Sequence, residues 1–109
     1  MREISVTKQL AGYVSEQELQ KAIVAYAKLQ RWLVYHTYDS RRSNPGFPDL
    51  VLVKNGRVIF AELKSQRGRL RAEQALWLAE LRKTGLEAYV WFPLDWMEGT
   101  IEKILDEEK

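Results

Sequence analysis

The chain has 109 residues, of which 46% are hydrophobic and 29% are charged, and its formal net charge at pH 7 is only +2. This length fits one domain over residues 1–109, and the lack of cysteine and the single histidine exclude disulfides, thiolate zinc sites and histidine-rich metal sites. No apolar run approaches the ~18 residues of a membrane span, and the N-terminus lacks a signal-peptide pattern, so we expect a cytoplasmic protein without a membrane partner.

Residues 1–14 are expected to form an irregular lead-in or a short strand, and the first clear element follows them. Ser15 and Glu18 have the spacing of a capping box, which predicts a helix from there to about Arg31. Residues 33–38 are rich in β-branched and aromatic side chains, and this composition predicts a first strand.

Asn55-Gly56 is the strongest turn signal in the sequence, because this pair favours the two-residue turn of a β-hairpin. The apolar runs on either side predict strands over about residues 49–54 and 57–65. Both faces of these strands are apolar. We therefore expect them at the centre of a sheet that is covered on both sides.

The second half of the chain predicts a helix over about residues 71–84, which ends at Gly85. Residues 88–92 predict a further strand, and Asp95 with Glu98 resembles a second capping box that opens a C-terminal helix. The expected order is α-β-β-β-α-β-α. The fold class is therefore α/β, with a mixed central sheet flanked by helices.

The hairpin register brings two carboxylates together. If Lys54 pairs with Arg57, Asp49 lies directly opposite Glu62, with Cβ atoms about 4.5–5.5 Å apart. Lys64 follows two residues after Glu62 and projects from the same face. Two opposed carboxylates destabilise a sheet unless a cation lies between them. Because the candidate ligands are carboxylate and carbonyl oxygens, the expected cation is Mg²⁺ or Mn²⁺.

These residues suit phosphodiester hydrolysis, which needs charge neutralisation, an activated water and a stabilised leaving oxygen. Asp49 and Glu62 would be metal ligands, and the backbone carbonyl of Leu63 is a candidate third oxygen. Lys64 would orient or help to deprotonate the attacking water and offset phosphate charge. The alternative is that Asp49 only ends a loop and that Glu62 and Lys64 form a surface pair. The apolar strands disfavour this alternative, because an unpaired charge in a central strand is unfavourable.

Two predicted helices add polar residues that are candidates for the active site. Gln74 begins an inward stripe with Trp77 and Leu78, which predicts contact with the strand ends. The alternative is a glutamine at the start of the helix that lies partly in water. Glu16 is favoured over Glu18 as an additional metal or water ligand, because Glu18 already has the capping role.

Arginines gather in the two segments that flank the hairpin. Arginine contacts phosphate oxygens in a bidentate manner, so these side chains are candidates for DNA-backbone binding. The alternative is an ordinary solvated surface. The residues concerned are Arg41, Arg42, Arg67, Arg69 and Arg71.

The order Gly46-x-Pro48-Asp49, Glu62-x-Lys64 and Gly68-Arg69-Leu70 leading to Glu73-Gln74 resembles the VRR-NUC family, a branch of the PD-(D/E)xK nuclease superfamily. The resemblance covers about residues 15–92 and implies a restriction-endonuclease-like fold and a metal-dependent nuclease. It implies that Asp49 and Glu62 bind metal and that Lys64 and Gln74 assist at the phosphate. Glu16 best matches the acidic residue that the family carries in its first helix.

The resemblance also implies a biological role. Small stand-alone members, often phage-encoded, resemble Holliday-junction resolvases and act as homodimers. The leading hypothesis is therefore a structure-selective DNA endonuclease that cuts four-way junctions in a bacterial or phage-infected cell. A flap or end nuclease, a restriction-type enzyme and a catalytically silent DNA-binding module are the alternatives. The candidate dimer surface, which would otherwise complete the core, is formed by Trp91, Phe92, Trp96 and Met97.

Overall fold

The computed structural model describes residues 2–37 and 44–108, with side chains from residue 6 onward. Its elements form a mixed sheet with helices on both faces, so the expected fold class is confirmed. In chain order they are α1 (Arg2–Ala11), α2 (Glu16–Leu29), β1 (Leu33–His36), β2 (Leu50–Lys54), β3 (Arg57–Leu63), α3 (Ala72–Lys83), β4 (Glu87–Trp91), α4 (Pro93–Met97) and α5 (Thr100–Asp106).

The sheet has the order β1-β2-β3-β4, with antiparallel pairing from β1 to β3 and parallel pairing between β3 and β4. Lys54 pairs with Arg57, which confirms the register predicted from the turn. Both turn residues have positive φ angles, 50° at Asn55 and 76° at Gly56, as a two-residue hairpin turn with the twist of its strands requires.

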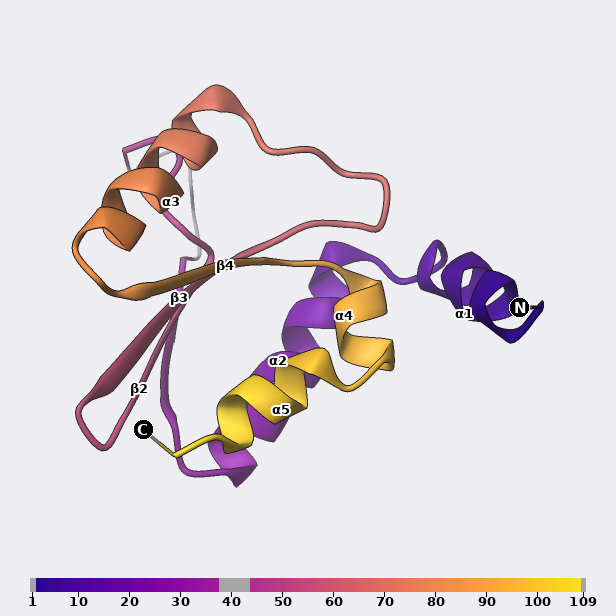
Figure 1. Cartoon of the computed structure of the whole chain (residues 1–109), viewed down its shortest axis with the longest axis horizontal. Coiled ribbons are helices and arrows are strands. Elements are labelled where there is room, and N and C mark those ends of the chain that lie inside the picture. Colours follow the sequence, from indigo (N-terminus) through magenta and orange to yellow (C-terminus); the bar gives the residue numbers. More distant parts are fainter. Residues whose placement is uncertain (1, 38–43, 109) are drawn as a thin grey trace.

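Helices cover the two faces of the sheet unequally, as Figure 1 shows: α2, α4 and α5 lie on one side and α3 on the other. The first side contains the main core, where Ile23 of α2 packs in one cluster with Leu52 of β2 and Ile59 of β3. These side chains are fully buried. Burial of such apolar side chains is the main driving force for this fold.

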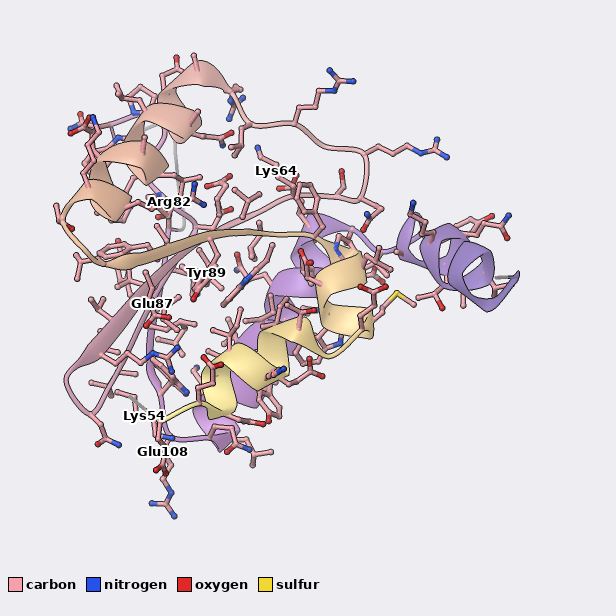
Figure 2. The ribbon with its side chains drawn as sticks, in the orientation of Figure 1. Lys54, Lys64, Arg82, Glu87, Tyr89 and Glu108 are labelled. Carbon is pink, nitrogen blue, oxygen red and sulfur yellow. The ribbon has the colours of Figure 1, made fainter. Side chains whose placement is uncertain are left out.

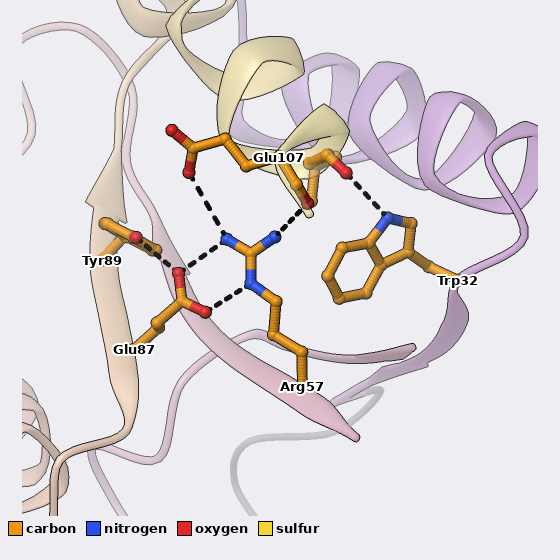
Figure 3. A network of polar contacts seen from close by, with 6 residues as sticks. Trp32, Arg57, Glu87, Tyr89 and Glu107 are labelled. Atoms are coloured by element: carbon orange, nitrogen blue, oxygen red, sulfur yellow. Dashed lines mark hydrogen bonds and ion pairs between the residues drawn. The ribbon is translucent and has the colours of Figure 1, made fainter. Parts of the chain in front are cut away.

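Figure 2 shows how side chains are divided between the faces, with Lys64 and Arg82 on the side of α3 and Glu87 and Tyr89 on the side of α5. A polar network on the side of α5 joins the hairpin to the C-terminal residues (Figure 3). Arg57 donates hydrogen bonds to the carboxylate of Glu87 and to the backbone carbonyl of Glu107, at 2.8 and 3.0 Å.

The N-terminal segment differs from the expectation. Residues 2–11 form helix α1, not an irregular lead-in or a strand, so the order α-β-β-β-α-β-α lacked one helix. The segment has no side-chain capping signal of the kind that marks α2. Ala11 is fully buried, and α1 packs against α4, so contacts with a distant part of the chain stabilise it.

The C-terminal helix also differs, because it is divided into α4 and α5 by Gly99, whose φ is 79°. Asp95 does not open the helix as its N-cap. Pro93 occupies the first turn, and the carboxylate of Asp95 accepts a hydrogen bond of 2.8 Å from the backbone N–H of Phe92. Proline is favoured at the first helical position because its missing N–H would be unpaired there in any case.

The aromatic residues considered as a dimer surface mostly complete the core of the single chain. Trp91 is 2% exposed and stacks on Tyr89, with ring centroids 5.5 Å apart. Trp96 packs edge-on against Tyr26 of α2 at 6.0 Å. Only Met97 of this set is exposed. In the part of the chain that the structure describes, no helix is long and apolar enough to cross a bilayer.

Candidate active site

A cleft of about 650 Å³ lies where β2 begins and β3 ends, beside the N-terminus of α3. It collects side chains from four separate segments of the chain. The polar residues that matter for chemistry in its wall are Glu16, Asp49, Glu62, Lys64 and Gln74.

Asp49 is held in place by backbone hydrogen bonds on both sides. Its carboxylate Oδ2 accepts a hydrogen bond of 2.8 Å from the backbone N–H of Leu63, and its own carbonyl accepts one of 3.1 Å from the N–H of Thr37. The side chain thus continues the β2–β3 ladder one step beyond the last backbone pair. This anchoring fixes the carboxylate at the strand end, opposite Glu62.

Glu62 is unusual for an acidic residue, because it is only 3% exposed. Its Oε2 accepts a hydrogen bond of 2.8 Å from Nε2 of Gln74 and lies 3.5 Å from Nζ of Lys64. Its Oε1 is buried and has no hydrogen-bond donor among the described residues. Burial, and then the negative charge of Asp49, raise the pKa of Glu62 to about 7.

Lys64 lies on the same face as Glu62 and is 8% exposed. Its backbone N–H donates to the carbonyl of Trp91 at 3.0 Å, which fixes the residue at the end of the β3–β4 pairing. Its ammonium group therefore points into the cleft from a rigid strand end. The ion pair partly offsets the charge of Glu62, and Lys64 accordingly opposes the rise in the pKa of that carboxyl.

Gln74 is buried on the inward face of α3, as its spacing predicted. Its Oε1 accepts a hydrogen bond of 2.9 Å from the backbone N–H of Arg71, while its Nε2 donates to Glu62. The first bond caps the helix, so the same amide joins the start of α3 to the carboxylate. Because both ends of the amide are engaged, its orientation is fixed.

The two acidic residues at the start of α2 have different positions. Glu18 forms the predicted capping box, with hydrogen bonds of 3.0 Å in each direction between it and Ser15. Glu16 is exposed and lines the cleft. Over residues 2–37 and 44–108, no three acidic or histidine side chains are gathered closely enough to hold a metal ion by themselves. Glu16 therefore stands at the rim, apart from the Asp49–Glu62 pair.

The arginines that were predicted to bind DNA differ in where they lie relative to the cleft. Arg69 and Arg71 line the cleft itself, whereas Arg67 lines a neighbouring hollow. Arg41 and Arg42 lie outside the described residues. Leu63 donates its backbone N–H to Asp49, and its side chain is buried in the core.

The loop before Asp49 contains two residues, Gly46 and Phe47, whose positioning role the sequence reasoning did not assign. Gly46 has a φ of 97°, and a Cβ there would lie 2.5 Å from the backbone oxygen of Glu73. Phe47 packs edge-on against Trp77 of α3 and Phe60 of β3, with centroids 5.1 and 6.1 Å apart. These contacts hold the loop against α3. The signal was present in the glycine that precedes the proline and Asp49.

Comparison with known proteins gives one family. Residues 7–91 match the VRR-NUC domain, and this span includes every residue that lines the cleft. No curated protein matches the chain. Because the match covers most of the chain, the protein belongs to the VRR-NUC domain family, whose members are nucleases of the PD-(D/E)xK type.

Proposed function

We propose that this chain is a metal-dependent endonuclease that hydrolyses phosphodiester bonds in branched DNA, with the four-way junction as its main substrate. The observation that carries the proposal is the opposed pair Asp49 and Glu62 beside Lys64 in one cleft. A buried carboxylate with a raised pKa next to a second carboxylate is typical of a functional site rather than of a structural ion pair.

The residues of the cleft fit a divalent cation. The buried Oε1 of Glu62 has no donor among the described residues, and a cation would satisfy it and neutralise the repulsion from Asp49. Mg²⁺ or Mn²⁺ suits a set of carboxylate and carbonyl oxygens. Asp49, Glu62 and the carbonyl of Leu63 would hold it, and Glu16 would contribute from the rim, directly or through water. When bound, the cation neutralises phosphate charge and makes water a stronger nucleophile.

The chain's own groups have separate tasks in this reaction. Lys64 orients the attacking water and offsets the negative charge that develops on the phosphate. Gln74 keeps the carboxylate of Glu62 turned into the cleft through its hydrogen bond. Arg69 and Arg71 supply positive charge at the cleft for the DNA backbone, and Arg41, Arg42 and Arg67 are further candidates for this contact.

We also propose that the chain acts as a homodimer, as a single domain over residues 1–109, in the cytoplasm of a bacterial or phage-infected cell. A four-way junction needs two symmetric cuts, and a two-fold dimer supplies two sites with that symmetry. An exposed apolar strip supports this. Leu33 and Tyr35 of the edge strand β1 and Val53 of β2 are 73%, 61% and 38% exposed. Leu33 pairs with Val53, so these side chains share one face.

The test is cleavage by the purified chain of labelled four-way junction, flap, single-stranded and duplex DNA, each with Mg²⁺, with Mn²⁺ and with chelator. We expect paired cuts in the junction that require the cation and are lost in Asp49→Ala. Cuts confined to flaps or ends would favour a flap or end nuclease. Binding without any cleavage would identify a silent DNA-binding module.

A further inference from the structure

A second hollow, of about 670 Å³, lies beside the active-site cleft. One wall is the end of α1 with the turn that follows it, and the other is the loop after β3. Figure 1 shows this loop passing beside the connection between α1 and α2. The residues that matter for its chemistry are Gln9, Leu10, Tyr13 and Arg67.

Two chain segments contribute to both hollows, which places the second hollow near the first. Tyr13 lines the second hollow, and Glu16, three residues later, lines the cleft. In the other wall, Arg67 lines the second hollow, and Lys64, three residues earlier, lines the cleft. A DNA strand that continues from the cleft along these two segments would reach Tyr13 and Arg67.

Both walls are fixed to the same helix, so the hollow is a built feature of the fold. Helix α1 packs against α4. The loop is tied to α4 as well, because Oε1 of Gln66 accepts a hydrogen bond of 2.9 Å from the backbone N–H of Leu94. The backbone N–H of Gly68 donates to the carbonyl of Ser65 at 2.9 Å, which closes a tight turn around Arg67.

The lining suits a nucleotide rather than a cationic partner. Tyr13 is 85% exposed, so its ring has no role in the core and presents its face to solvent. Arg67 is exposed too, and no acidic side chain lines the hollow among the residues that the structure describes. An aromatic face next to an arginine is the combination by which proteins bind single-stranded nucleic acid, because the base stacks and the phosphate pairs with the cation.

We propose that this hollow binds one unpaired nucleotide of the DNA substrate, with its base stacked on Tyr13 and its phosphate paired with Arg67. The proposal rests on the proposed nuclease function and adds to it a reason for selecting branched DNA. In a continuous duplex both faces of each base are covered by neighbouring bases, so the ring of Tyr13 finds no partner. A flap offers an unpaired base, and a four-way junction offers one where its centre opens.

The test measures binding of the full-length chain, in chelator, to fluorescent single-stranded, flap and fully paired duplex DNA. Tyr13→Phe keeps the ring and should bind all three as the wild type does. Tyr13→Ala and Tyr13→Leu should weaken flap and single-strand binding about ten-fold or more, in line with the loss of base stacking, and leave duplex binding unchanged. Arg67→Gln should reduce the log–log salt slope for single-stranded DNA by about 0.7.

Full single-strand affinity in Tyr13→Ala, or an equal loss of affinity for duplex, would overturn the proposal. Tyr13→Leu separates stacking from simple apolar contact, and full affinity in that variant would also overturn it. Cleavage by the wild type in Mg²⁺ is scored on the same substrates. Absence of any cleavage contradicts the nuclease function, whereas the ratio of flap to duplex binding reports on the hollow alone.

Discussion

Glu62 makes the stability of the metal-free protein depend on pH in an unusual direction. Its pKa rises from 4.5 to about 7 on folding, because of burial and the charge of Asp49. The folded state thus holds the proton more tightly than the unfolded state. The stability that this proton gives to the fold is complete below pH ~4.5 and is lost as the pH rises through about 7. In chelator, we expect the free energy of unfolding to fall by on the order of 3 kcal/mol between pH 5 and about 8. The melting temperature should fall over the same range.

Glu62→Gln is the matched variant for this prediction. The amide has nearly the same shape as the carboxylic acid and carries no charge at any of these pH values. The variant should therefore lack the fall and melt above the wild type at pH 8. Thermal unfolding followed by circular dichroism measures both proteins, and identical pH profiles would show that another group is responsible.

Metal binding should reverse the instability at neutral pH. Mg²⁺ or Mn²⁺ that binds only the folded state stabilises it by ~2.7 kcal/mol at a hundred times its dissociation constant, so the melting temperature should rise on titration. Asp49→Asn should abolish this rise and the cleavage activity. Asparagine keeps an oxygen that accepts the hydrogen bond from the N–H of Leu63, so the fold should be retained. An undiminished metal-induced rise in Asp49→Asn would remove Asp49 from the ligand set.

Lys64 should affect the reaction rate much more than DNA binding. The ammonium group lies within the wall of the cleft, 3.5 Å from Glu62, where its charge acts on the reacting phosphate. Removing a group of this kind lowers the rate by about 10²–10³-fold. Single-turnover cleavage and binding in chelator separate the two quantities for Lys64→Met. A variant that cuts at the wild-type rate would contradict the assigned role.

The segment before Asp49 determines where that residue lies, and its Gly46 lies close to the backbone of Glu73 in α3. Alanine at this position would combine a φ of 97° with a Cβ 2.5 Å from the backbone oxygen of Glu73. We expect Gly46→Ala to destabilise the fold by more than ~2 kcal/mol and to lower cleavage, because the loop must move away from α3.

Gly85→Ala is the control for this prediction. Its φ is 86°, and a Cβ there would meet nothing within 4 Å. It therefore reports backbone strain alone, of about 1 kcal/mol. Chemical unfolding compares the two variants. Equal destabilisation would mean that the close approach to α3 is unimportant.

The elements differ in how much their own sequence determines them. The turn at Asn55-Gly56 fixes the hairpin register locally, and the register in turn brings Asp49 to Glu62, so this part of the site was predictable. The helix α1 was not, because it depends on packing against α4, which is far away in sequence. For the same reason the sequence could not show that Gln74 uses both ends of its amide, or that one oxygen of Glu62 is left without a donor.

At the scale of the whole molecule, the exposed apolar face of β1 and β2 is the part of the described surface that best accounts for a dimer. Leu33 and Tyr35 project from the edge strand β1, on the same face as Val53 of β2. Exposed apolar strips of this kind often mark contacts with a partner. The aromatic residues near β4 are excluded as the main contact, because Trp91 and Trp96 pack inside the chain.

Leu33→Glu combined with Tyr35→Glu should therefore convert a dimer into a monomer without unfolding it, because two exposed side chains are replaced. Light scattering at micromolar concentration, with and without junction DNA, measures the change in mass. The altered protein should still nick a flap or a single junction strand, because each chain holds a complete cleft, but it should lose the paired cuts that resolve a junction. A wild type that is monomeric in both conditions would contradict the dimer, and its single site would then suit cleavage at flaps or ends.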